Sequence, residues 1–242
     1  METIDVDLGV LAHPRDGVHP GVVLIHDVWG VGDHTRDLAR RLAAEGFAVL
    51  AVDLYRNKGD FRIDAPGPFM RALSDPEAVA DVREAVAFLA RHPASHGRPA
   101  GVVGFCMGGM VALLAACAAP ELAAAVPFYG LLSHEHGLLH AEEGLDPEKK
   151  PRQPLDSVVD LQCPLLCFFG ADDEFVPMSD VERLRQRLAA GTVPAEVVVY
   201  PGAGHAFMND TRPDAYRPET ARDAWRRMTA FLHARLDAEP GA

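Results

Sequence analysis

The chain has 242 residues, of which 48% are hydrophobic and 24% charged, so it can form a packed core and is not of the disordered class. Its formal net charge of −12 argues against nucleic acid and anionic membranes as partners, because their phosphates would be repelled. The N-terminus lacks a basic segment followed by an apolar one, and no apolar run reaches membrane-spanning length, so a cytoplasmic protein with four reduced cysteines is expected.

The first part of the chain alternates short apolar runs with an amphipathic stretch. A period of two over residues 3–10 predicts a half-exposed strand at a sheet edge. Apolar runs predict buried strands at 21–25 and 47–52. Between them, residues 33–45 predict a helix that Gly46 closes.

The same alternation continues to the C-terminus. Ser74 and Glu77 form a capping box that opens a helix, with Val79, Val82, Val86 and Leu89 on its apolar stripe. Further strands are expected at 100–105, 122–128, 164–169 and 195–200, and a further helix at 108–119. A second capping box at Ser179 and Glu182 predicts another helix, with Val181, Leu184 and Leu188 facing inward. The last helix is expected to run through Trp225, Met228 and Leu232. This order predicts a single α/β domain over residues 1–242, with a mostly parallel sheet and helices on both faces. Residues 131–160, rich in His, Glu, Lys and Pro, are expected to form a loop or lid insertion.

The run Gly104-Phe-Cys-Met-Gly-Gly109 stands between a predicted strand and a predicted helix. This is the context of a nucleophile elbow, in which the reactive side chain lies on a sharp turn flanked by small residues. Gly104 and Gly108 flank Cys106 here, where the usual motif carries Ser. A thiolate is the stronger nucleophile but must first lose its proton. Cys106 is therefore the candidate nucleophile, although a cysteine is also often a buried core residue.

Two later strand ends supply candidate partners for Cys106. Asp173 follows the strand expected at 164–169, and His205 follows the one at 195–200, which is the nucleophile–acid–histidine order of α/β-hydrolase triads. We expect His205 to act as the general base and Asp173 to hold its tautomer, with Asp172 as the competing acid.

The oxyanion that forms in such a reaction needs N–H donors. The N–H of Met107, at the start of the elbow helix, is the first candidate, and the N–H of Val28, in the turn after residues 21–25, is the second.

The other cysteines and a group of histidines do not predict a metal site. Cys117 lies in an apolar helix, and Cys163 and Cys167 have no paired histidine nearby. His134, His136 and His140 lie beside glutamates, where a solvated loop is the favoured interpretation and a bound metal the alternative.

Six motifs together make the chain resemble the dienelactone hydrolase (carboxymethylenebutenolidase) family, a cysteine branch of the α/β-hydrolases, over nearly its whole length. The motifs are His26-Asp-Val-Trp-Gly30, Val52-Asp-Leu-Tyr55, Gly104-Phe-Cys-Met-Gly-Gly109, Phe128-Tyr-Gly130, Asp173-Glu-Phe-Val-Pro177 and Ala203-Gly-His-Ala-Phe207. The resemblance implies an α/β-hydrolase fold without a separate cap domain. It also implies hydrolysis of an enol-lactone such as 4-carboxymethylenebut-2-en-4-olide to maleylacetate in the degradation of aromatic compounds, with no cofactor.

The resemblance also implies roles for residues around the nucleophile. Asp27 stands where family members carry a glutamate that interacts with the resting thiol; the alternative is that Asp27 binds local amides. Family members hold the substrate carboxylate with arginines, one of them four residues after the histidine, where this chain has Asn209 with Arg212 close by. Arg62 and Arg71 lie in the region of the other arginine, and the alternative for each is an ordinary surface residue.

Trp29, Tyr129 and Phe207 are expected to wall an apolar pocket at the nucleophile, with core packing as the alternative. The expected partner is a small ester or lactone, with no nucleic acid and no membrane, and the chain is expected to be a monomer or a small homo-oligomer. Two other functions remain open: a carboxylesterase or thioesterase of the same fold, and a non-catalytic or redox-sensing protein in which oxidants react with Cys106.

Overall fold

The computed structural model describes residues 1–59 and 61–237 and builds them around one eight-stranded sheet. The strands run in the order β1-β2-β4-β3-β5-β6-β7-β8, and neighbours are parallel from β4 to β8. Their bounds are β1 Glu2–Val6, β2 Gly9–His13, β3 Gly21–Ile25, β4 Ala48–Val52, β5 Ala100–Phe105, β6 Leu122–Phe128, β7 Leu165–Gly170 and β8 Ala195–Tyr200. The α/β-hydrolase fold and its mostly parallel sheet are thus confirmed.

The N-terminal strand prediction is wrong in one respect. Residues 3–10 do not form one strand, because a two-residue turn at Asp7 and Leu8 separates β1 from β2 and the two pair antiparallel. The apolar–polar alternation of the sequence continues through the turn, so a period of two could not reveal it. β1 lies at the exposed edge, as expected of the segment, and β2 is mostly buried against β4.

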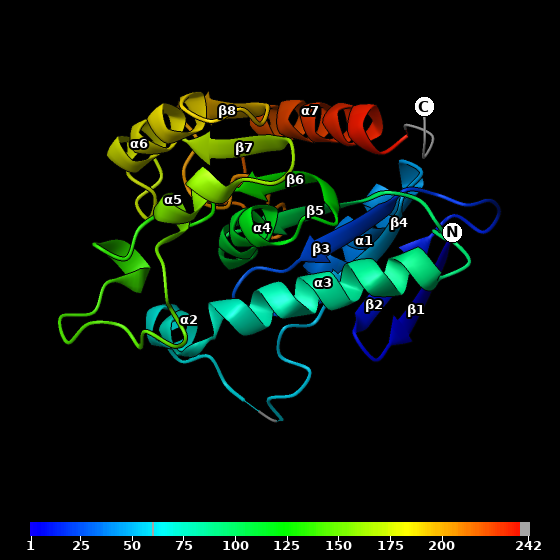
Figure 1. Cartoon of the computed structure of the whole chain (residues 1–242), viewed down its shortest axis with the longest axis horizontal. Helices are drawn as coiled ribbons and strands as arrows, with labels where there is room; N and C mark the ends of the chain where they lie inside the picture. The colour runs from blue at the N-terminus through cyan, green and yellow to red at the C-terminus, as the bar shows by residue number, and fades with distance from the viewer. Residues whose placement is uncertain (60, 238–242) are drawn as a thin grey trace.

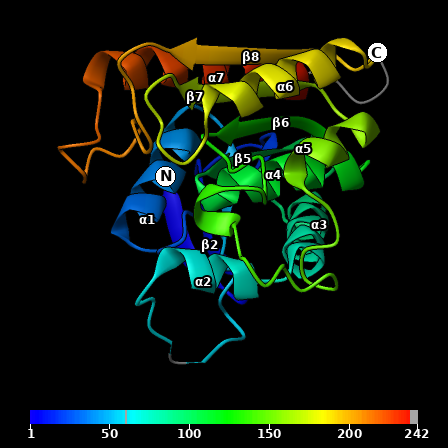
Figure 2. The same ribbon diagram turned by 90° about the vertical axis from the view of Figure 1, so that its left-hand side faces the viewer.

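Helices cover both faces of the sheet, as Figures 1 and 2 show. α1 (Asp33–Ala44) and α7 (Pro218–Leu236) pack against one face of the sheet and form a core there with Leu38, Leu42, Met228 and Leu232. α3 (Asp75–Arg91), α4 (Met107–Ala118) and α6 (Met178–Ala189) pack in the core on the other face. Within the described residues, no helix combines the length and the apolar character needed to cross a membrane.

The two predicted capping boxes differ in outcome. The Ser74 Oγ accepts a hydrogen bond of 3.2 Å from the N–H of Glu77, so α3 begins as expected. The box at Ser179 is wrong: α6 begins at Met178 directly after Pro177, so Ser179 lies inside the first turn and no side chain caps the helix. Pro177 has no N–H that needs a partner and already has a helix-compatible φ of −58°, so α6 begins directly after it, before Ser179.

Two parts of the chain contain short helices that the sequence pattern did not predict. α2 spans Pro66–Ala72, and the expected loop at 131–160 contains η1 (Gly137–Leu139), α5 (Pro154–Ser157) and η2 (Val158–Asp160). α2 packs against η1, and the two lie at the left of Figure 1, α2 in cyan and η1 in the green segment.

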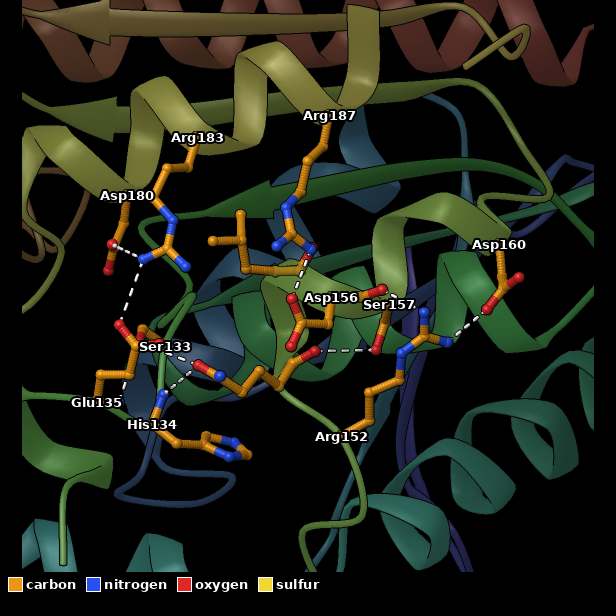
Figure 3. A network of polar contacts seen from close by, with 12 residues as sticks. Ser133, His134, Glu135, Arg152, Asp156, Ser157, Asp160, Asp180, Arg183 and Arg187 are labelled. Atoms are coloured by element: carbon orange, nitrogen blue, oxygen red, sulfur yellow. Dashed lines mark hydrogen bonds and ion pairs between the residues drawn. The ribbon is translucent and has the colours of Figure 1, made fainter. Parts of the chain in front are cut away.

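Arginines of α6 fasten the 131–160 segment to the rest of the fold (Figure 3). The Arg183 guanidinium lies 3.4 Å from the Glu135 carboxylate and 3.3 Å from the buried Asp180 carboxylate. Arg187 donates to the Leu155 carbonyl at 2.9 Å and pairs with Asp156 at 2.5 Å. Contacts near both ends of the segment therefore hold η1 in place between them.

Candidate active site

A cavity of about 120 Å³ opens where β3, β5 and β6 end, next to the turn that follows β8. In an open parallel sheet, these carboxyl ends are where residues far apart in sequence meet. The wall contains, among others, Asp27, Val28, Trp29, Pro66, Cys106, Tyr129, Leu138, Phe175, His205, Asn209 and Arg212. The candidate nucleophile and the candidate base thus face one space.

Cys106 occupies a sharp turn between β5 and α4. Its φ of +57° lies in the left-handed region, which a residue with a Cβ adopts only when its surroundings impose it. Two flanking glycines make the turn possible by close approach: a Cβ on Gly104 would lie 1.9 Å from the Gly108 carbonyl oxygen, and one on Gly108 would lie 2.4 Å from the Ile25 carbonyl oxygen. The glycine spacing in the sequence therefore has a direct steric cause.

Asp173 and His205 are in contact. His205 Nδ1 lies 2.8 Å from Asp173 Oδ2, and Asp173 Oδ1 accepts the N–H groups of Phe175 at 2.8 Å and Val176 at 3.2 Å. The Asp173 side chain is fully buried, whereas Asp172 is exposed. Of the two competing carboxylates, Asp173 is the one that reaches the histidine.

The other nitrogen of the His205 ring, Nε2, is buried and makes no hydrogen bond to the residues the structure describes. Burial alone lowers the pKa of His205, but the charge of a Cys106 thiolate and the bond to Asp173 outweigh it and raise that pKa to about 10. The upward shift of the His205 pKa therefore depends on negative charge on its two neighbours.

Of the two predicted oxyanion donors, Val28 lines the cavity, whereas Met107 follows the cavity residue Cys106 in the chain but is not itself part of the wall. Met107 is the first residue of α4, so its N–H has no carbonyl partner inside the helix, and the positive end of the helix dipole lies there. Val28 lines the cavity and is 4% exposed. Their N–H groups come from two separate chain segments, as an oxyanion hole of this fold requires.

Backbone strain gathers around the cavity. Three residues other than glycine have a positive φ among those described: Cys106 at +57°, Tyr129 at +39° and Ala206 at +60°. All three line the cavity. Each such residue costs about 1–3 kcal/mol and persists only where the fold enforces it, so this clustering supports the cavity as the candidate site.

Asp27 lies in the cavity wall, but its carboxylate is engaged locally. Its Oδ1 accepts the N–H of Trp29 at 2.9 Å, which is the local-amide alternative. This bond shapes the turn after β3 that carries Val28.

The arginines lie differently from what the family resemblance implied. Arg62 is 87% exposed and pairs with Asp64, and it does not line the cavity. Arg71 donates to the Leu138 carbonyl at 2.8 Å and thereby joins α2 to η1. Arg212 is the one arginine among the described residues of the cavity wall, because a turn after the buried Asn209 brings the chain back.

Of the three expected aromatic walls, Trp29 and Tyr129 line the cavity. Phe207 does not: it is fully buried behind Tyr129, with ring centroids 5.2 Å apart, because the positive φ of Ala206 redirects the chain between His205 and Phe207. Phe175 takes the place at the wall instead, with its ring edge-on to His205 at 5.0 Å. Phe175, Leu138 and Pro66 were not predicted, and no periodic pattern distinguishes them.

The remaining cysteines and the loop histidines are dispersed. Burial raises the pKa of Cys117 and that of Cys163 to about 12, which makes both thiols poor nucleophiles. His136 Nε2 lies 2.8 Å from Asp180 Oδ2, in contact with α6. No group of three or more metal-binding side chains occurs in the part of the chain that is described.

Comparison with known proteins supports one family. The sequence model of the Dienelactone hydrolase family matches residues 8–236. A protein named "Putative carboxymethylenebutenolidase" from Escherichia coli K12 is 36% identical over 228 residues, which cover 91% of this chain and 80% of that protein. A "Probable 2-oxo-3-(5-oxofuran-2-ylidene)propanoate lactonase" from a Bradyrhizobium species is 32% identical over 233 residues, covering 95% of this chain and 90% of that one.

A solved structure agrees with these sequence matches. The crystal structure titled "Putative Dienelactone Hydrolase" from Klebsiella pneumoniae superposes with a TM-score of 0.82 at 37% identity. The match covers 92% of this chain and 91% of that chain. Fold and sequence thus point to the same family.

Proposed function

The chain belongs to the dienelactone hydrolase family and is a hydrolase, and we propose that it cleaves small esters and lactones through a thioester on Cys106. The observation that carries the proposal is the position of His205. Its Nδ1 bonds to the buried Asp173 carboxylate, while its Nε2 has no hydrogen-bond partner among the described residues and its ring lines the cavity with Cys106. This is the arrangement that a histidine needs to move a proton at Nε2.

The reaction begins with the transfer of the Cys106 proton to His205 Nε2. The thiolate attacks the carbonyl carbon, and the C=O π electrons move to oxygen, whose charge the N–H groups of Met107 and Val28 stabilise. Collapse of this tetrahedral intermediate breaks the bond to the ring or ester oxygen, which takes the proton from His205.

Water completes the cycle. His205 Nε2 removes a proton from a water molecule, whose oxygen attacks the thioester carbonyl. The thiolate leaves, the product is a carboxylic acid, and the Cys106–His205 pair is restored. When the leaving oxygen is an enol, as in an enol-lactone, the released enol becomes a ketone, and that step makes ring opening effectively irreversible.

A dienelactone such as 4-carboxymethylenebut-2-en-4-olide fits the composition of the cavity. Its flat ring suits a wall of Trp29, Tyr129 and Phe175, and its carboxylate suits the guanidinium of Arg212. We therefore propose hydrolysis of this lactone to maleylacetate as the specific reaction. Arg62 and Arg71 have no part in it, because neither lines the cavity.

The test compares p-nitrophenyl acetate, both dienelactone isomers and an acyl-CoA as substrates for the wild type, Cys106→Ala and Cys117→Ala. Cys117 is the matched control, since it is a buried thiol in α4, the helix that Cys106 precedes, and it does not line the cavity. We expect Cys106→Ala to lose all activity and Cys117→Ala to keep it. Hydrolysis that survives in Cys106→Ala would refute the thioester, and turnover of the acetate without either lactone would indicate a general esterase instead.

A further inference from the structure

A buried tyrosine connects the two chain segments that carry the oxyanion donors. Tyr55 follows β4 and is 3% exposed. Its hydroxyl donates to the Val28 carbonyl oxygen at 2.9 Å and lies 3.3 Å from the Met107 Sδ. Val28 and Met107 are the two residues whose N–H groups face the developing charge in the proposed reaction, and the reaction itself gives Tyr55 no role.

The bond to Val28 acts on the direction of that residue's N–H. The N–H of Val28 belongs to the peptide unit shared with Asp27, whose carbonyl oxygen accepts from the N–H of Gly30 at 3.3 Å and contacts the buried His26 Nδ1. The carbonyl of Val28 belongs to the next peptide unit, and Tyr55 holds it. With both units held, the φ and ψ angles of Val28 are fixed.

One further contact makes the arrangement specific. The Leu54 N–H donates to His26 Nε2 at 3.2 Å, so the proton of the neutral ring is on Nδ1 and points to the Asp27 carbonyl. Burial lowers the pKa of His26, which keeps the ring neutral. Burial also raises the pKa of Tyr55, so its hydroxyl keeps the proton that it donates.

We propose that Tyr55 is a positioning residue that preorganises the oxyanion hole, by fixing the peptide unit after Val28 and by packing its hydroxyl against the side chain of Met107. The proposal rests on the proposed function, since these N–H groups stabilise an oxyanion only if the protein catalyses acyl transfer. Tyr55 does not line the cavity, so it acts through Val28 and Met107 and not on the substrate.

Tyr55→Phe tests the proposal because it removes only the hydroxyl. The ring contacts to His26 at 4.7 Å and to Phe69 at 5.1 Å remain possible. The matched control is Tyr200→Phe, which removes a hydroxyl that donates to Asp223 at 2.8 Å on β8, outside the cavity.

We expect kcat for p-nitrophenyl acetate to fall about 10–50-fold in Tyr55→Phe, less than the 100–1,000-fold loss when a donor itself is removed. KM should change less than about threefold, because the oxyanion forms only after binding. Alkylation of Cys106 by iodoacetamide should keep its wild-type rate, since that reaction develops no oxyanion. Tyr200→Phe should leave all three quantities unchanged.

Amide hydrogen exchange supplies a readout that needs no turnover. The N–H of Trp29 shares a peptide unit with the Val28 carbonyl, so its exchange should accelerate in Tyr55→Phe and not in Tyr200→Phe. A kcat within about twofold of wild type together with unchanged Trp29 exchange would overturn the proposal. So would an alkylation rate that falls in parallel with kcat, because the defect would then lie in the thiol and His205.

Wild-type turnover that survives Cys106→Ala would overturn the proposed function and this inference with it. Turnover that is lost in Cys106→Ala, with turnover and Trp29 exchange both unchanged in Tyr55→Phe, would overturn this inference alone.

Discussion

Replacing Asp173 by Asn should switch His205 to the wrong tautomer. Asp173 Oδ1 accepts two backbone N–H groups, from Phe175 and Val176, and Oδ2 faces His205 Nδ1. The amide oxygen of Asn must take the Oδ1 position to keep those two bonds. Its NH2 group then points at Nδ1, which has to accept, so the ring proton moves to Nε2 and the ring can no longer remove a proton from Cys106.

The magnitude follows from the chemistry of the nucleophile. The same exchange in a Ser-His-Asp triad lowers kcat about 10,000-fold. A thiol is more acidic and more nucleophilic than a hydroxyl, so part of the thiolate forms without the histidine. We therefore expect kcat/KM to fall about 100–1,000-fold in Asp173→Asn, which corresponds to about 2.7–4 kcal/mol of transition-state stabilisation.

The assay is hydrolysis of p-nitrophenyl acetate from pH 6 to pH 10, with Asp172→Asn as the matched control on the neighbouring exposed carboxylate. In Asp173→Asn the rate should rise steadily with pH, because solvent hydroxide must deprotonate the thiol. Asp172→Asn should stay within about twofold of wild type. The reasoning fails if Asp172→Asn costs as much as Asp173→Asn, or if Asp173→Asn keeps more than about a fifth of the activity.

Three further changes test other parts of the structure. In Cys106→Ala the pKa of His205 should fall from about 10 towards its ordinary value, because the thiolate charge that raises it is gone. An NMR titration of the His205 ring measures this pKa, and an unchanged value would contradict the role of the Cys106 charge in the shift. In Arg212→Ala the KM for a carboxylate-bearing lactone should rise about tenfold while that for p-nitrophenyl acetate stays constant, and a uniform effect on both would remove the guanidinium from substrate binding. In Lys150→Met, the buried Asp75 carboxylate loses its partner at 2.5 Å, so denaturant unfolding should show a loss of about 3–5 kcal/mol, which Lys150→Met with Asp75→Leu should largely reverse.

The sequence predicts the centre of the fold best. The strands expected at 21–25, 100–105, 122–128 and 195–200 have the observed bounds. The first three are near-continuous apolar runs bounded by turn residues, which is the pattern of parallel strands covered on both faces. Prediction is poorer at 3–10, where a two-residue turn preserves the apolar–polar alternation of the sequence. It is also poorer at 66–72, where Pro66, Gly67 and Pro68 do not suggest a helix and tertiary contacts, among them packing against η1, support one.

The candidate triad could be predicted for a related reason. Cys106, Asp173 and His205 each stand just after a strand and next to a glycine-containing turn, so their chain positions place them at one edge of the sheet. The direction of a loop side chain is different, because it depends on single backbone angles. The positive φ of Ala206 sends Phe207 into the core, and a turn at Asn209 returns Arg212 to the cavity, and neither event has a pattern in the sequence.

The residues proposed for the chemistry and the residues proposed for substrate specificity lie on different kinds of segment. The groups that would move protons and charge lie on strand ends and on the first turn of α4, whereas Pro66, Leu138 and Phe175 of the wall lie on short segments without periodicity. Arg71, for example, holds η1 to α2 through its hydrogen bond to the Leu138 carbonyl. A change in such a contact would move the wall without moving Cys106 or His205. The substrate of this chain is therefore better inferred from the contacts around η1 and α2 than from its candidate triad.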